Sequence, residues 1–210
     1  MDTPVRKFFN VVGPAIFVAI GTGIGFAIYS MGDTAKFDSK INMLFQNDLQ
    51  WGYLSSFLFC YLVQHLNSYP MQYKARIMRG KSGQMRSNMF IYRNAAEGSP
   101  QSRIVLSTEG DEAFYNRANR SLYHFMENSL SMVLAIILDS VVFPIPTFVL
   151  TIFFFIGRII YTSGYTSGGY GKHAPGFIIV AIAQNTLVGL LLIAGLKGLT
   201  GTSSNGPSYQ

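Results

Sequence analysis

The strongest constraint on this chain of 210 residues is a series of long apolar stretches. A helix that crosses a bilayer needs about 20 mostly apolar residues. Four stretches satisfy this requirement: 11–30, 115–140, 147–165 and 176–198. A fifth stretch, 51–69, carries more polar residues and is a marginal span. The sequence therefore predicts an all-α integral membrane protein with five spans.

The composition supports a membrane protein over a soluble one. Charged residues make up only 12% of the chain, against about 25% in typical soluble domains. The single cysteine, Cys60, excludes a disulfide framework and a cysteine-based metal site. The three histidines are scattered without the spacing of metal ligands, so we expect no metal site.

The basic residues are unevenly distributed. Nine of the sixteen Lys and Arg residues fall between Lys74 and Arg120. Apolar spans flank this segment, so a membrane-side loop explains it better than a nucleic-acid surface. Basic loops remain on the cytosolic or matrix face of a membrane. We therefore expect the N-terminus and the basic loop on that face, with membrane lipids and no nucleic acid as partners.

The spans divide the chain into three parts. Residues 1–49 hold an N-terminal transmembrane helix and a connecting loop, 50–198 form a four-helix membrane domain, and 199–210 form a polar tail. Within the domain, 70–114 is predicted to be a long basic loop. In the first span Gly21 and Gly25 stand four residues apart, which favours close packing of one helix on another in lipid.

Two polar stripes mark the candidate site. At the start of the third span, ionisable residues follow the spacing i, i+3, i+7, i+10: Arg117, Arg120, His124 and Glu127. Near the inner end of the fourth span, a second stripe follows i, i+3, i+7: Arg158, Tyr161 and Tyr165. Because charges are costly in lipid, two stripes at similar depth predict a shared polar cavity between the helices.

These residue types favour a small zwitterionic ligand. Arginine forks pair with carboxylates, and tyrosine hydroxyls donate hydrogen bonds from an apolar wall. Glu127 could hold an ammonium group or pair with an arginine. A molecule with two carboxylates and one amine, such as glutathione, fits this set. The alternative is an internal ion network that only fixes the packing of the helices.

The same residues resemble a known family of membrane-associated proteins in eicosanoid and glutathione metabolism, the MAPEG family. Its members read R-A-x-x-N-x-x-E at the start of one span and G-R-x-x-Y-x-x-G-Y at the end of the next. The segment "GRIIYTSGY" at 157–165 matches the second pattern, and "RSLYHFMEN" at 120–128 keeps Arg120 and Glu127 of the first. The resemblance covers residues 50–198 and is greatest to the branch of microsomal glutathione transferases and leukotriene synthases.

The resemblance implies a fold and a site. It implies a four-helix protomer, here with an extra N-terminal transmembrane helix, and a homotrimer that binds glutathione between protomers. It places six residues around glutathione: Arg120, His124, Glu127, Arg158, Tyr161 and Tyr165. Active members carry an arginine seven residues after the last tyrosine, where this chain has Lys172. A cation there would stabilise the glutathione thiolate, which is the nucleophile.

The resemblance leaves two functions open. The first is a glutathione transferase or peroxidase that acts on lipophilic electrophiles or lipid hydroperoxides. The second is a catalytically impaired accessory subunit of a larger membrane complex, held by helix 11–30 and the tail. It is favoured by departures from the family pattern at Leu122, His124 and Asn128. Either protein would reside in the endoplasmic reticulum or the mitochondrial membrane.

Overall fold

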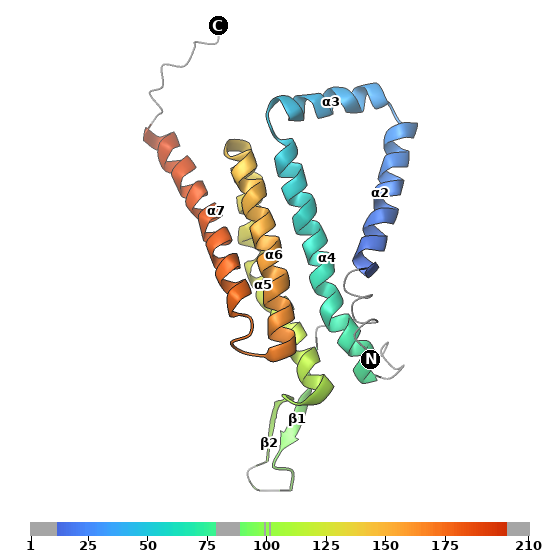
Figure 1. The fold of residues 1–210 in the computed structure, drawn as a ribbon, viewed down its shortest axis with the longest axis vertical. Helices are drawn as coiled ribbons and strands as arrows, with labels where there is room; N and C mark the ends of the chain where they lie inside the picture. The colour runs from blue at the N-terminus through green and yellow to red at the C-terminus, as the bar shows by residue number, and fades with distance from the viewer. Residues whose placement is uncertain (1–11, 79–88, 99, 101, 201–210) are drawn as a thin grey trace.

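The protein is a bundle of long helices with one small β-hairpin at an end (Figure 1). The computed structural model describes residues 12–78, 89–98, 100 and 102–200. The helices are α2 (Gly13–Met31), α3 (Thr34–Gln46), α4 (Gln50–Met78), α5 (Gly110–Val142), α6 (Pro144–Gly168) and α7 (Ala174–Thr200). Strands β1 (Tyr92–Ala95) and β2 (Arg103–Leu106) pair antiparallel. The predicted all-α membrane fold, a four-helix bundle with an added N-terminal helix, is confirmed.

The helices have the lengths that a bilayer demands. Among the described residues, α2, α5, α6 and α7 are long and apolar enough to cross a membrane. Helix α4 is more polar, but its 29 residues exceed the length of a span. It packs along α5 and α6, and its Ser55, His65 and Gln72 are buried there. These polar side chains face the bundle, so α4 can lie beside the apolar helices, but its crossing of the membrane as a fifth span remains a prediction.

The core lies between α4, α5, α6 and α7. The ring of Phe59 lies 5.7 Å from that of Phe125 and 6.4 Å from that of Phe154, measured between centroids. Met132 and Leu187 are fully buried in the same cluster. This packing fixes the inner face of α6 one turn before the candidate site.

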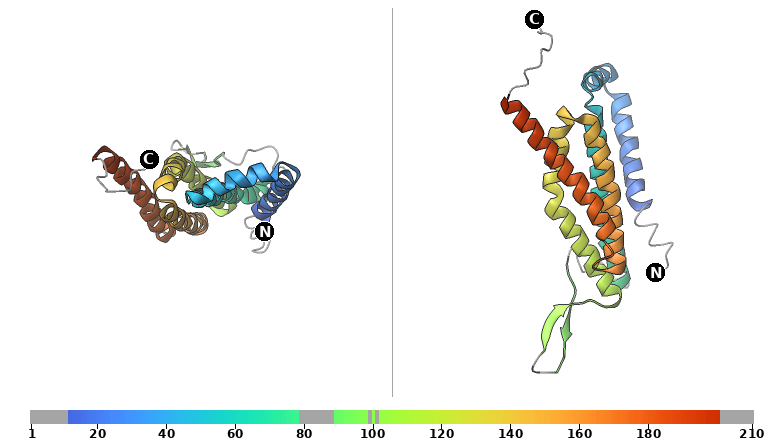
Figure 2. Two further views of the ribbon diagram at one scale, coloured as in Figure 1. Left: turned by 90° about the horizontal axis from the view of Figure 1, so that it is seen from above. Right: turned by 60° about the vertical axis from the view of Figure 1, so that its left-hand side comes forward.

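Two predicted loops contain regular structure. The connection expected within 1–49 includes α3, which begins after Asp33, whose side chain accepts a hydrogen bond from the Lys36 N–H. The expected loop 70–114 is shorter because α4 continues through the buried Pro70 to Met78, and α5 already begins at Gly110. The hairpin occupies part of the remainder (Figure 2).

The hairpin is attached to α5 through the buried amide of Asn116. Its Nδ2 donates to the carbonyls of Ile91 (2.8 Å) and Ser107 (2.9 Å), and its Oδ1 accepts from the Ile91 N–H (2.9 Å). Asn119 adds a bond from its Nδ2 to the Met89 carbonyl (2.9 Å). The base of the hairpin is therefore held by side chains of α5.

Replacing Asn116 by alanine is expected to release the hairpin while leaving the bundle folded. Three hydrogen bonds of about 0.5–1.5 kcal/mol each are lost. Hydrogen exchange should accelerate across 89–107 but not in α6. Asn67→Ala is the control, because the Asn67 amide donates to the carbonyl of Val63 in its own helix and not to the hairpin residues that the structure describes. Unchanged exchange in the hairpin would show that Asn116 does not hold it.

Helix α2 has little contact with the rest of the chain. Among its described residues only Pro14 is buried. A Cβ added at Gly21 or Gly25 would meet nothing within 4 Å. Within the described part of the chain, nothing packs closely on these glycines, and packing on another chain remains a prediction. The predicted tail begins inside α7, and its residues 201–210 lie outside the described part.

Candidate functional site

Arg158 is the centre of the candidate site. It is only 1% exposed. Its Nη1 lies 3.2 Å from Nδ1 of His124, and its Nη2 donates to the Ser121 carbonyl over 3.2 Å. The guanidinium carbon lies 4.8 Å from the ring centre of Tyr161. Among the described residues its Nε has no hydrogen-bond partner and no carboxylate pairs with it. A buried cation is thus held by an imidazole, a carbonyl and an aromatic face.

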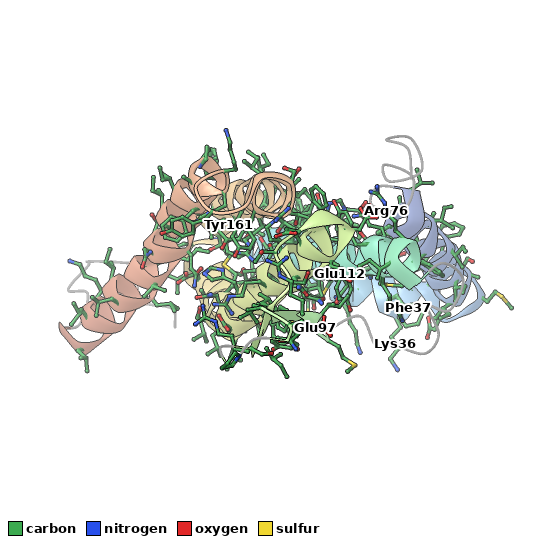
Figure 3. All side chains as sticks on the ribbon, turned by 90° about the horizontal axis from the view of Figure 1, so that it is seen from below. Lys36, Phe37, Arg76, Glu97, Glu112 and Tyr161 are labelled. Carbon is green, nitrogen blue, oxygen red and sulfur yellow. The ribbon has the colours of Figure 1, made fainter. Side chains whose placement is uncertain are left out.

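Aromatic rings surround this cation where α5, α6 and the start of α7 meet. One of them is Tyr161 on α6, which is labelled in Figure 3. The Tyr161 ring stacks on His124 at 5.3 Å between centroids. His173 meets Tyr161 edge-on at 5.0 Å and Tyr165 at 5.4 Å. The Nδ1 atom of His173 is buried without a hydrogen-bond partner among the described residues. Tyr161, Tyr165 and His173 thus add hydroxyl and imidazole groups to the site.

The predicted stripe on α5 divides into two edges. Arg120 pairs with Glu127 at 3.0 Å, and both side chains are about half exposed. His124 instead faces Arg158, and Arg117 donates from Nε to the Thr166 carbonyl at 2.9 Å. Side chains seven residues apart on a helix differ by only about 20° in direction, so His124 follows Arg117 and Glu127 follows Arg120. Arg120 is turned about 60° from Arg117, which separates the two pairs. Arg120 and Glu127 therefore lie on the exterior of the protomer.

Lys172 and His173 have different positions. Lys172 is exposed, and its aliphatic chain lies against Gly168. The loop before α7 folds back so that the Lys172 carbonyl lies against Gly164. This fold brings His173, which the sequence pattern did not indicate, into the cluster and leaves Lys172 at its edge. The signal in the sequence was only its position next to Lys172.

The contacts of Arg158 favour a different alignment of the family pattern R-A-x-x-N-x-x-E, which from the sequence alone was matched at Arg120 and Glu127. The pair R-A of that pattern occurs literally at Arg117 and Ala118. In this register the pattern's asparagine falls on Ser121 and its glutamate falls on His124, the two residues that contact Arg158. A histidine then stands where the pattern has a carboxylate. This substitution leaves the charge of Arg158 without an acidic partner among the described residues.

A pocket of about 460 Å³ adjoins the cluster beneath the hairpin. Arg117, Arg120 and Tyr165 line one side, and Phe90 and Tyr92 line the other. The pocket connects the exterior edge of α5 with the end of α6, so a ligand of moderate size has room beside the aromatic wall. In the described part of the chain, no three His, Cys, Asp or Glu side chains gather in one place.

Comparison with known proteins identifies the family. The model of the MAPEG family matches residues 56–196, which is more than half of the chain. No curated protein and no solved structure matched the chain. The matched segment includes most of α4 and α7, all of α5 and α6, and every residue of the cluster around Arg158. The chain therefore belongs to the MAPEG family.

Proposed function

We propose that this protein binds glutathione at Arg158 and uses the thiol to conjugate lipophilic electrophiles or to reduce lipid hydroperoxides. The observation that carries the proposal is the burial of Arg158 without an acidic partner among the described residues. An unpaired buried charge costs several kcal/mol. A carboxylate of glutathione would offset that cost and accept hydrogen bonds from the guanidinium.

The neighbouring groups have defined roles in this proposal. Tyr161 and Tyr165 direct their hydroxyls to the ligand, and His124 and His173 form the walls of its site. Arg120 and Glu127 are exposed on the single protomer, which supports a homotrimer in which a neighbouring protomer closes the site. Glutathione would then bind between protomers, as in the family that the chain resembles.

The proposed chemistry starts from the glutathione thiolate. Lys172 at the edge of the cluster would stabilise this anion. The sulfur attacks an electrophilic carbon, a C–S bond forms, and the leaving group departs. With a hydroperoxide, the sulfur takes the terminal oxygen and releases the lipid alcohol; a second glutathione then gives the disulfide and water. The substrate would enter from the membrane, in the endoplasmic reticulum or the mitochondrion, with the hairpin on the cytosolic or matrix side.

Turnover by the purified protein tests this proposal. The substrates are glutathione with 1-chloro-2,4-dinitrobenzene, and glutathione with a fatty-acid hydroperoxide. Lys172→Ala should lower kcat by about 10–100-fold with little change in the KM for glutathione, because the cation acts on the thiolate. Lys172→Arg should retain activity, and Lys36→Ala in α3 is the surface control. Absence of both turnover and saturable glutathione binding would reject the proposal.

The alternative, an impaired accessory subunit, is supported by the exposure of α2. This apolar helix buries only Pro14 and leaves its glycines open, as a helix that docks on another chain would. Native mass spectrometry of the complex extracted from its membrane distinguishes the two functions. One copy among different subunits supports the accessory role, whereas three copies alone contradict it.

A further inference from the structure

At the end of the bundle opposite to Arg158, the structure buries a carboxylate that no described side chain neutralises. Asp139 lies three residues before the end of α5 and is 1% exposed. Neither carboxylate oxygen has a hydrogen-bond partner among the described residues. An ionised carboxylate in a membrane span is costly unless a proton or a cation neutralises it. Asp139 thus requires a positively charged species that the neighbouring side chains do not supply.

The hydroxyl groups near this end are oriented as acceptors. Each donates its proton to a carbonyl of its own helix: Ser55 to Trp51, Ser140 to Ile136, Thr147 to Phe143 and Thr151 to Thr147. All four residues are at most 5% exposed. A hydroxyl has one proton and two lone pairs. With the protons committed, these oxygens can accept but cannot donate to Asp139.

The chain brings these residues to one level of the bundle. Asp139 and Thr147 both lie four residues from Phe143, on either side of the turn between α5 and α6. The Phe143 N–H donates to the Asp139 carbonyl (2.6 Å), and the Thr147 N–H donates to the Phe143 carbonyl (2.9 Å). Helix α4 reaches the same level, because a Cβ on Gly52 would lie 2.7 Å from Cβ of Ser140.

Two further features favour a positive charge here. The Oε1 atom of Gln50, at the start of α4, is also buried without a partner among the described residues. The last turn of a helix carries the negative end of its dipole, which attracts cations, and Asp139 lies in the last turn of α5. The rings of Trp51 and Phe148, 5.1 Å apart, join α4 to α6 at this level.

We propose that this end of the bundle binds a sodium ion through the carboxylate of Asp139 and the oxygens of Thr147, Ser140 and Ser55. A single carboxylate neutralises a monovalent ion, whereas a divalent ion would leave a buried positive charge. The ligands are all oxygens, which suit a hard cation rather than zinc or copper. The close contact of α4 with α5 at Gly52 favours a small ion over a large one.

Thermal unfolding of the purified full-length protein tests this site. Melting is compared in sodium, potassium and choline chloride at equal ionic strength. Sodium should raise the melting temperature saturably by about 3–6 °C over choline, because it binds only the folded state. Asp139→Asn should abolish this dependence, and Asp38→Asn in α3 should keep it.

The rival explanation is a protonated Asp139 that binds no ion. It predicts equal melting temperatures of the wild type in the three salts, and that result would overturn the proposal. Thr147→Val offers a second readout that does not depend on the folding of Asp139→Asn. It removes one oxygen at similar volume, so it should weaken the apparent sodium affinity by about tenfold. If the melting temperature of Thr147→Val depends on sodium as that of the wild type does, Thr147 is not a ligand of the ion. Equal melting of the wild type in all three salts would reject the site as a whole.

Discussion

Replacing Arg158 by leucine is expected to abolish glutathione binding without lowering the stability of the fold. Arg158 is 1% exposed, and no carboxylate among the described residues pairs with it. Removing a buried charge that lacks a counter-ion relieves its desolvation cost. The melting temperature should therefore stay constant or rise, while the affinity for glutathione falls by more than about 100-fold. Calorimetric titration and thermal unfolding measure the two effects on the same sample.

Two variants sharpen this prediction. Arg158→Lys keeps the charge but loses the planar fork, so we expect an affinity loss of about tenfold. Arg76→Leu removes an exposed arginine that pairs with Asp111, and it should leave binding unchanged. If Arg158→Leu unfolds the protein, the arginine serves packing, as the internal ion network would require. If Arg158→Leu binds glutathione normally, the ligand site lies elsewhere.

Replacing Gly176 by valine is expected to be the most destabilising single change in the bundle. A Cβ at this position would lie 2.6 Å from the Gly157 carbonyl oxygen and would clash with the backbone N of Tyr161. Backbone atoms cannot move aside as a flexible side chain can, so α7 must separate from α6. We expect a loss of more than about 3 kcal/mol in the free energy of unfolding, and a fall of about 10 °C in the melting temperature.

The same change should also disrupt the site. Tyr161 lies on α6 and His173 immediately precedes α7, so separation of these helices breaks their contact. Glutathione binding should be lost even below the melting temperature. Gly189→Ala is the control on the same helix, because an added Cβ there meets nothing within 4 Å. If Gly176→Val melted at the same temperature as Gly189→Ala, α6 and α7 would not be closely packed at this point.

The membrane fold was largely predictable because lipid imposes long apolar helices. The sequence predicted α4 only as a marginal span because it carries several polar residues. Hydropathy alone does not show that these residues face the bundle. Helix α3 and the hairpin were missed. The hairpin depends on the side-chain amide of Asn116, which forms hydrogen bonds with both the N–H and the carbonyl of Ile91, 25 residues away in the sequence. Such a tertiary contact leaves no periodic pattern in the local sequence.

The candidate site was predictable where spacing along one helix determines it. The spacing of Arg158, Tyr161 and Tyr165 placed them on one face of α6, and the structure keeps them together. From the sequence, the first family pattern was matched at Arg120 and Glu127, whereas the contacts of Arg158 favour the alignment that starts at Arg117. His173 depends on how the loop folds back. Their roles in glutathione binding remain predictions.

The burial of Asp139 could not be predicted from the sequence. In the sequence, Asp139 stands at the end of the apolar stretch 115–140, where a charge is expected at the membrane boundary. The structure buries it because the turn at Phe143 is short and brings α6 against the last turn of α5. Only the hydrogen bonds of the neighbouring hydroxyls reveal that the described residues offer no donor to its carboxylate.

Calorimetric titration of the wild-type protein with glutathione, and with glutathione esterified at both carboxylates, tests the central claim most directly. If the buried guanidinium of Arg158 holds a ligand carboxylate, glutathione should bind saturably and the diester at least about tenfold more weakly. Equal affinity for the two compounds, or no saturable binding of glutathione, would contradict the account.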